Sequence, residues 1–351
     1  MARRAESLLC RWDLDKTYLR SEFETLRQLL RTAWERGEDK IEVPGVPEVL
    51  KALKASSERT GRPLAIHFIS ASPPQIGKAI RDKLALDGVP YDGIVFKDQL
   101  RHIRRGKFRN LREHVGFKLR ELMRGRLAID SSPDELLFGD DWESDPLTYS
   151  AYADVVAGQM RGRALETLLV RIGVDRSAVP ELLALAERIP PAPQAVRRIF
   201  INLARRTPPA HLQAFGPRLV PTFNYFQTAV VLAADGVLDR TGVRDVARAL
   251  ADRATYTPTQ LDNSLADLIR RGCVSEWTAQ SLVRPLRREG LLPARSRRPR
   301  WRRRLQRWIR RRRVDATAER RTLDYEAILA RLPHLTRTGA ERVDVEEVPA
   351  T

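Results

Sequence analysis

Short runs of apolar residues, each ending at polar positions, recur through the first 140 residues of the chain. They span residues 8–12, 64–69, 93–96 and 136–138. Continuous apolar runs of this length are typical of strands in a parallel sheet that helices cover on both faces. Between the runs, apolar residues recur at helical spacing, so strands and helices alternate. This alternation predicts the α/β class, with a doubly wound parallel sheet.

Helical spacing continues through the second half of the chain. Residues 151–190 carry such a pattern, and an apolar run at 196–203 predicts one more strand of the sheet. Beyond it we expect an all-helical C-terminal region, and a capping box at Thr257 marks one of its helix starts. The expected helices cover about 222–234, 241–253, 258–271 and 276–289.

The pattern divides the 351 residues into several parts. We predict a domain over residues 1–205, with a helical insertion at about 151–195, followed by a helical domain over 206–293. An Arg-rich amphipathic segment at 294–314 and a C-terminal helix with a flexible tail at 315–351 complete the chain. The intervals between the strands leave no room for a large cap domain over the sheet.

Composition places the protein among ordinary globular proteins, with 42% apolar residues. The longest apolar run, at 229–234, is far too short to span a bilayer, and the N-terminus has no signal-like apolar stretch. Cys10 and Cys273 lie far apart, which does not indicate a disulfide framework. We therefore expect a cytoplasmic protein, with peripheral membrane association as a further expectation.

Two carboxylates, Asp13 and Asp15, follow the first predicted strand. Ligand chemistry in open α/β sheets gathers at the carboxyl ends of strands. Two acids at such a place are costly unless a cation or a shared proton compensates their charge. The stretch therefore predicts a divalent-metal site in which a carboxylate acts as nucleophile.

Other polar residues occupy comparable positions further along the chain. Ser70 directly follows the second apolar run, Lys118 lies in a predicted helix, and Asp140 follows the fourth run. Each alone is weak evidence, since turns, loop hydroxyls and solvated helix charges explain such residues more often. Their combination in this order favours a functional site. Ser72 is an alternative to Ser70.

These motifs resemble, in their order, those of the haloacid dehalogenase superfamily of aspartyl phosphotransferases. More narrowly, residues 6–152 look like the conserved domain of the actin-patch-type phosphatidate phosphatases. The resemblance implies a Rossmannoid core. The residues that carry it are Asp-Leu-Asp-Lys-Thr at 13–17, Pro44-Gly45-Val46, the stretch from Phe68 to Pro73, Lys118, Gly139-Asp140-Asp141, Asp145-Pro146 and Tyr149.

The resemblance implies a role for each catalytic residue. Asp13 would attack phosphorus and form an aspartyl-phosphate, which divides one difficult step into two easier ones. Asp15 would protonate the leaving oxygen and later deprotonate water. Ser70 and Lys118 would hold the phosphoryl oxygens, where negative charge spreads in the transition state.

The same resemblance implies Mg²⁺ as cofactor. Mg²⁺ requires oxygen ligands, which Asp13, the carbonyl of Asp15 and Asp140 would supply. Asp141 and Asp145 would bind the ion or orient its ligands. The chain departs from the narrower family at Lys16, where a third acid is usual, at Trp142-Glu143, which replace small residues, and in the late position of the strand at 196–203.

Charge is concentrated in one place. The net charge is +18, and residues 295–313 hold twelve Arg and no acid, which leaves +6 for the rest. Apolar residues in this segment lie at helical spacing, a profile typical of helices in anionic membrane interfaces. A nucleic-acid arm and a solvated basic tail are the alternatives. The residues expected to contact a membrane or polyanion are Trp301, Arg302, Arg303, Trp308, Arg311 and Arg312.

An open site and a basic segment together favour a phosphate carried on something large. We predict a Mg²⁺-dependent phosphatase acting on phosphatidate or a related lipid phosphate at a membrane surface. The alternatives are a phosphatase for nucleic-acid ends or another large substrate, and a non-catalytic scaffold that binds membrane or nucleic acid. The oligomeric state is not predicted.

Overall fold

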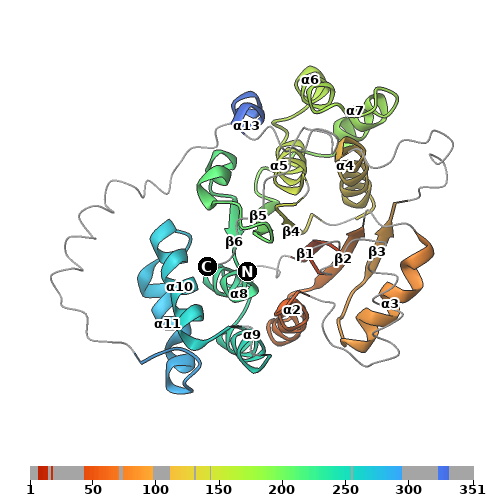
Figure 1. Cartoon of the computed structure of the whole chain (residues 1–351). Helices are drawn as coiled ribbons and strands as arrows, with labels where there is room; N and C mark the ends of the chain where they lie inside the picture. Colours follow the sequence, from red (N-terminus) through yellow and green to blue (C-terminus); the bar gives the residue numbers. More distant parts are fainter. Residues whose placement is uncertain are drawn as a thin grey trace, which may run out of the picture.

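A parallel β-sheet forms the centre of the computed structural model (Figure 1). Within the described ranges the sheet has six strands in the order β3-β2-β1-β4-β5-β6. From β1 the chain continues to β2 and β3 on one side of the sheet, and from β4 it continues to β5 and β6 on the other side. The direction of strand addition therefore reverses between the neighbouring strands β1 and β4, which is a topological switch point. The structure describes residues 7–14, 17–18, 43–70, 74–97, 111–129, 132–142, 144–253, 256–294 and 323–331.

The strands follow the apolar runs closely, which confirms the predicted doubly wound α/β fold. All neighbouring strands pair in parallel. Their bounds are β1 Leu8–Asp13, β2 Leu64–Ser70, β3 Gly93–Phe96, β4 Asp134–Asp140, β5 Val196–Asn202 and β6 Leu219–Thr222. The sequence did not predict β6, because four residues that include Pro221 form a weak strand pattern, tolerated at the edge of a sheet.

One face of the sheet packs against helices from both halves of the chain. Cys10 and Trp12 of β1 lie in the same buried cluster as residues of all these helices. Their bounds are α2 Val46–Thr60, α3 Gly77–Leu86, α8 Tyr225–Ala234, α9 Arg240–Asp252, α10 Pro258–Arg271 and α11 Glu276–Arg288. The 206–293 segment thus packs on the sheet through its helices, and its division into a separate domain stays a prediction.

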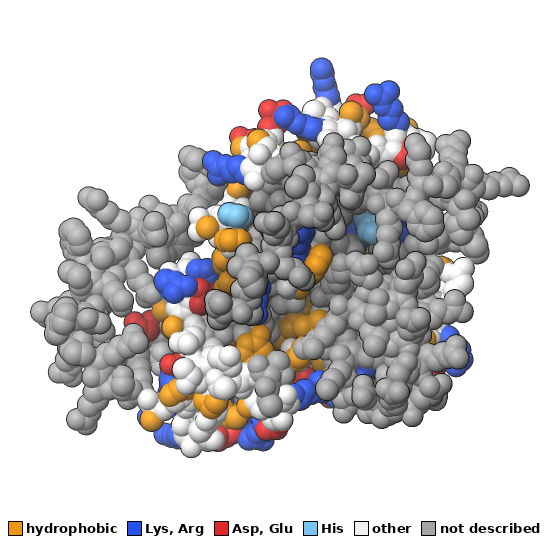
Figure 2. Space-filling view, in the orientation of Figure 1, with side chains coloured by type: hydrophobic (Ala, Val, Ile, Leu, Met, Phe, Trp, Pro, Cys, Tyr) orange, Lys and Arg blue, Asp and Glu red, His pale blue; other side chains and the backbone are white. Residues whose placement is uncertain are grey.

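The opposite face carries a second buried cluster (Figure 1). The helix predicted near 113–124 and those predicted within 151–190 lie here. The elements of this layer are α4 Leu111–Leu127, α5 Asp145–Val156, α6 Gly162–Ile172, α7 Val179–Arg188, η3 Pro209–Phe215 and α13 Tyr325–Arg331, while the short η1 Pro74–Ile76 precedes α3. In Figure 2, Lys and Arg side chains project where α6 and α7 lie, and hydrophobic side chains gather nearer the centre.

Several helix boundaries have the local chemistry that the sequence indicates. The capping box between Thr257 and Gln260 is present at the start of α10, and Gly272 ends that helix in a left-handed conformation.

In the described ranges, no helix is both long and apolar enough to cross a membrane. The Arg-rich segment lies outside the described residues, and with it Trp301, Arg302, Arg303, Trp308, Arg311 and Arg312.

Candidate active site

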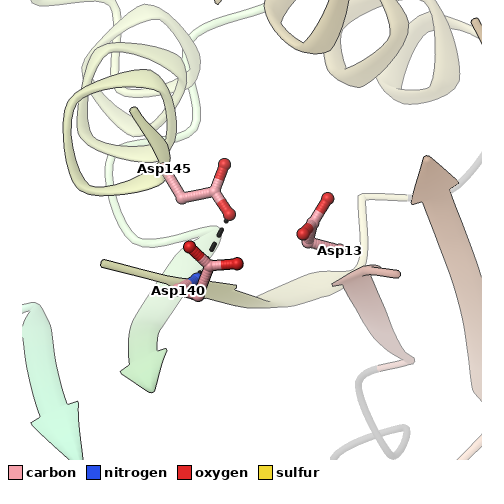
Figure 3. A group of neighbouring side chains, drawn as sticks. All are labelled: Asp13, Asp140 and Asp145. Carbon is pink, nitrogen blue, oxygen red and sulfur yellow. Dashed lines mark hydrogen bonds between the residues drawn. The ribbon is translucent and has the colours of Figure 1, made fainter. Parts of the chain in front are cut away.

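Three buried carboxylates meet at the switch point of the sheet (Figure 3). Asp13 is the last residue of β1, Asp140 is the last of β4, and Asp145 begins α5. All three are fully buried, and each offers an oxygen within 4.8 Å of the oxygens of the other two. The topology explains this convergence, since β1 and β4 are neighbours whose connections leave in opposite directions.

The turn after β4 aims Asp145 back toward the strand end. Asp145 Oδ2 accepts a hydrogen bond of 3.2 Å from the backbone N–H of Asp140. Gly139 makes room for this contact, because a Cβ there would lie 2.3 Å from Asp145 Oδ2. Pro146 follows Asp145 in the first turn of α5, where a proline costs no hydrogen bond and a negative charge is favoured by the helix dipole.

Lys118 connects two of the acids. It lies on α4, is fully buried, and places its Nζ 2.9 Å from Asp13 Oδ1 and 2.6 Å from Asp145 Oδ1. Three carboxylates and one ammonium leave this group formally negative. A divalent cation would offset that charge, and clustered carboxylate oxygens are the hard ligands that Mg²⁺ prefers. The residues present therefore fit a divalent metal site.

Thr17 lies between the two strand-end acids. Its Oγ1 is 3.4 Å from Asp13 Oδ2 and 3.4 Å from Asp140 Oδ2. Its carbonyl oxygen accepts a hydrogen bond of 2.9 Å from the hydroxyl of Tyr225, the first residue of α8. The helical segment that follows the sheet thus supports the loop after β1 directly.

Two buried tyrosines surround the acids and remain neutral. Burial, together with the negative charge of Asp145, raises the pKa of Tyr149 well above its usual value. Burial, and then the negative charge of Asp140, likewise raise the pKa of Tyr225. Both phenols therefore act as hydrogen-bond donors, and the Tyr149 hydroxyl donates to the carbonyl of Phe138 at 3.3 Å.

The other predicted site residues have different placements. Ser70 is the buried last residue of β2, one position beyond the Ile69 that pairs with Asp13. Asp141 is buried too, but its Oδ1 accepts the backbone N–H of Arg205 at 2.8 Å and its Oδ2 that of Thr207 at 3.1 Å. Its carboxylate therefore fixes the loop after β5. Asp15 and Lys16 lie outside the described residues.

Tyr225 and an adjoining pocket were not predicted. The pocket, of about 900 Å³, lies where the ends of β5 and β6 meet α8 and α10, and Trp142, Asn202 and Tyr225 help to line it. No local sequence pattern predicts that Tyr225 belongs to the site, because its contact with Thr17 joins residues 208 positions apart. Tyr225 stacks on Trp12, with ring centroids 5.9 Å apart, so the pocket and the strand-end acids share one supporting core.

Comparison with known proteins identifies a family for the first part of the chain. Residues 12–164 match the model of the family "Phosphatidate phosphatase APP1, catalytic domain". The match begins within β1 and includes the three acids and Lys118. It confirms the predicted resemblance and the prediction that the protein is a phosphatase. The comparisons found no matching curated protein and no matching solved structure.

Proposed function

We propose that the protein hydrolyses phosphatidate, or a related lipid phosphate, through an aspartyl-phosphate and with Mg²⁺, because residues 12–164 match the model of a phosphatidate phosphatase catalytic domain. The observation that supports this mechanism best is the convergence of Asp13, Asp140 and Asp145 around the ammonium of Lys118. Buried charges of this kind are costly to assemble and are typical of functional sites.

In the proposed reaction, a carboxylate oxygen of Asp13 bonds to phosphorus while the bond from phosphorus to the alcohol oxygen breaks. Asp15 donates a proton to that oxygen, and diacylglycerol leaves. Water, deprotonated by Asp15, then attacks the aspartyl-phosphate and releases inorganic phosphate. Lys118 and Ser70 hold the phosphoryl oxygens during both steps.

The metal ligands that we propose are Asp13, the carbonyl of Asp15 and Asp140, with Asp145 beside them. When bound, Mg²⁺ would supply positive charge for the phosphoryl oxygens. Asp145 also holds Lys118 in place through the 2.6 Å ion pair, which orients the ammonium for the phosphate. We propose that Asp141 acts indirectly, by fixing the loop that follows β5.

Removing divalent metal is expected to stop phosphate release from phosphatidate in detergent micelles. Without a cation, the buried acids repel the phosphoryl oxygens that must approach them. Treatment with EDTA should reduce the release of inorganic phosphate to background, and added Mg²⁺ should restore it. Full activity in EDTA would contradict the metal dependence.

The same assay distinguishes the proposed substrate from its alternative. The Arg-rich segment suits an anionic membrane surface, and we propose peripheral membrane contact there, but such segments also bind nucleic-acid phosphates. An oligonucleotide with a terminal phosphate therefore belongs in the panel. Faster release from the oligonucleotide than from phosphatidate would favour the nucleic-acid alternative.

Gly139→Ala is expected to lower phosphatase activity about 100-fold, which corresponds to about 2.7 kcal/mol of transition-state stabilisation. The added Cβ would lie 2.3 Å from Asp145 Oδ2, so the carboxylate and its ion pair with Lys118 must move. The measurement is kcat/KM for phosphatidate. Gly93→Ala is the matched control, at the start of β3, where the atom nearest to the added Cβ is His67 Cδ2 at an ordinary contact distance of 3.5 Å. Equal activity of Gly139→Ala and the wild type would contradict the role of Asp145.

A further inference from the structure

The pocket beside the three acids belongs to the face of the sheet that α8 and α10 cover. Its lining includes Trp142, two residues after Asp140, and Asn202, the last residue of β5. Lys118 approaches the acids from α4, on the opposite face (Figure 1). A substrate whose phosphate lies at the acids can therefore extend into the pocket without displacing Lys118.

The side-chain amide of Asn202 lies next to Asp140, one of the three acids of the proposed metal site. In the sheet, Asp140 pairs with Asn202, and Asn202 pairs with Thr222, so the three side chains leave the same face. Neighbouring strands are about 4.8 Å apart, which puts Asn202 within reach of a group bound to Asp140. Asn202 is only 8% exposed, yet its side chain makes no hydrogen bond to any residue of the described ranges.

The position of the Asn202 amide suits a ligand. Asn offers two N–H donors and one carbonyl acceptor. No described residue binds this amide, and it borders the pocket, so a ligand oxygen there can take the place of solvent.

The opposite wall of the pocket is already ordered by its own hydrogen bonds. Asn224 Oδ1 accepts the backbone N–H of Gln227 at 3.0 Å, and its Nδ2 donates to Ser264 Oγ at 2.8 Å. Gln227 Nε2 donates to the Ser264 carbonyl at 2.8 Å and to Asp267 Oδ2 at 3.2 Å. This wall ties α8 to α10, so the pocket is preformed and binding need not order it.

Aromatic side chains with arginines over their rings line the pocket as well. Trp142 and Phe223 are 36% and 38% exposed, which is unusual for large apolar residues. The guanidinium carbon of Arg205 lies 4.8 Å from the Trp142 ring centroid, and that of Arg271 lies 6.0 Å from the Phe223 ring centroid. The pocket therefore offers polar walls and an apolar, cationic rim to one ligand.

We infer that this pocket binds the alcohol half of the substrate, the glycerol backbone of phosphatidate with its ester groups. Asn202 hydrogen-bonds an oxygen of that backbone, and the first methylenes of the acyl chains contact Trp142 and Phe223. The inference rests on the proposed function, since it places the reacting phosphate at Asp13. A volume of about 900 Å³ lies in the range of small-molecule sites and exceeds what a phosphate alone requires.

The test fills the pocket without touching the acids. Asn263 and Ala266 are both exposed residues of α10, and only the first lines the pocket. In an Asp13→Asn background that blocks turnover, and in the presence of Mg²⁺, Asn263→Trp should weaken binding of monomeric dihexanoyl phosphatidate about 10-fold or more by calorimetry. Ala266→Trp should not weaken it. Binding of inorganic phosphate should be equal in both variants.

A second variant removes the polar partner itself. Asn202→Leu has nearly the same size but no amide, and should also weaken dihexanoyl phosphatidate about 10-fold while leaving inorganic phosphate binding unchanged. Equal lipid affinity in Asn263→Trp and Ala266→Trp would overturn the inference, and so would equal loss of lipid and phosphate binding in Asn202→Leu. The proposed function has a separate test. If the wild-type protein, with Asp13 intact, released no phosphate from phosphatidate in the presence of Mg²⁺, the proposed function would be wrong, whatever the binding variants show.

Discussion

Asp13→Asn is expected to lower phosphate release from phosphatidate at least about 10³-fold, as the loss of a nucleophile generally does. The amide is a poor nucleophile and cannot form the aspartyl-phosphate. The substitution also removes the carboxylate that pairs with Lys118 Nζ at 2.9 Å, so the orientation of the Lys118 ammonium changes as well. The measurements are kcat with phosphatidate micelles and the amount of acid-stable phosphoprotein after rapid quenching, which should be present in the wild type and absent in the variant.

Asp134→Asn is the matched control, because it makes the same chemical change at the other end of the sheet. Asp134 begins β4, and its Oδ2 pairs with Arg62 at 2.7 Å and with Arg197 at 3.0 Å. Its loss should leave kcat within about twofold of the wild type, since partly exposed pairs contribute little. Equal kcat values for Asp13→Asn and Asp134→Asn would rule out Asp13 as the nucleophile.

The central strands could be predicted because their pattern is local. Strands covered on both faces need continuous apolar runs, and the runs at 8–12, 64–69 and 136–138 are bounded by polar residues that end the pairing. The acids at their ends were predicted for the same reason. Asp13 and Asp140 lie where the strand pattern stops, and the alternation of strands and helices already implies that those ends meet.

Adjacent acids show where this reasoning ends. Asp140 and Asp141 have the same chemistry in the sequence, yet successive side chains of a strand leave opposite faces. Asp140 lies with the other two acids, while Asp141 accepts two backbone N–H groups of the loop after β5. Deciding between them requires the position of a loop more than sixty residues away, which no local pattern contains.

Long-range contacts also explain why the pocket was not predicted. Asn202, Asn224 and Ser264 are ordinary residues in their own segments, at the end of a strand, at a helix start and inside a helix. Their proximity results from packing α8 and α10 on the sheet. The edge strand β6, which the sequence did not predict, pairs with β5 and leads into α8.

A charged residue inside the apolar run of β1 also has its explanation in tertiary structure. Arg11 is 2% exposed, and its Nε lies 2.7 Å from Glu135 Oε2. Arg126 Nη1 lies 2.8 Å from Glu135 Oε1, and the Tyr152 hydroxyl donates to the same carboxylate. Burial and the Glu135 carboxylate raise the pKa of Tyr152 far above its usual value, so the hydroxyl stays a donor. One carboxylate thus pairs with two buried guanidinium groups and accepts a hydrogen bond from a buried tyrosine.

Glu135→Gln is therefore expected to lower the free energy of unfolding by about 3–5 kcal/mol, the cost of breaking a buried ion pair from one side. The substitution keeps the shape of the side chain but leaves Arg11 and Arg126 as two buried charges without an anion between them. Urea denaturation measures the change as a lower midpoint with an unchanged slope. Asp82→Asn is the control, since its pair with Lys78 is exposed and should contribute less than about 1 kcal/mol.

The effect on stability should be separable from catalysis. Glu135 lies near the start of β4, five residues before Asp140, or about 17 Å at the usual rise of a strand. The folded fraction of Glu135→Gln should therefore keep the kcat of the wild type at temperatures below its unfolding transition. If Arg11, Glu135 and Arg126 are all replaced by apolar residues of similar volume, most of the lost stability should return, because no buried charge then remains to be solvated. A triple variant as unstable as Glu135→Gln would show that the packing of these side chains, and not their charge, stabilises this end of the sheet.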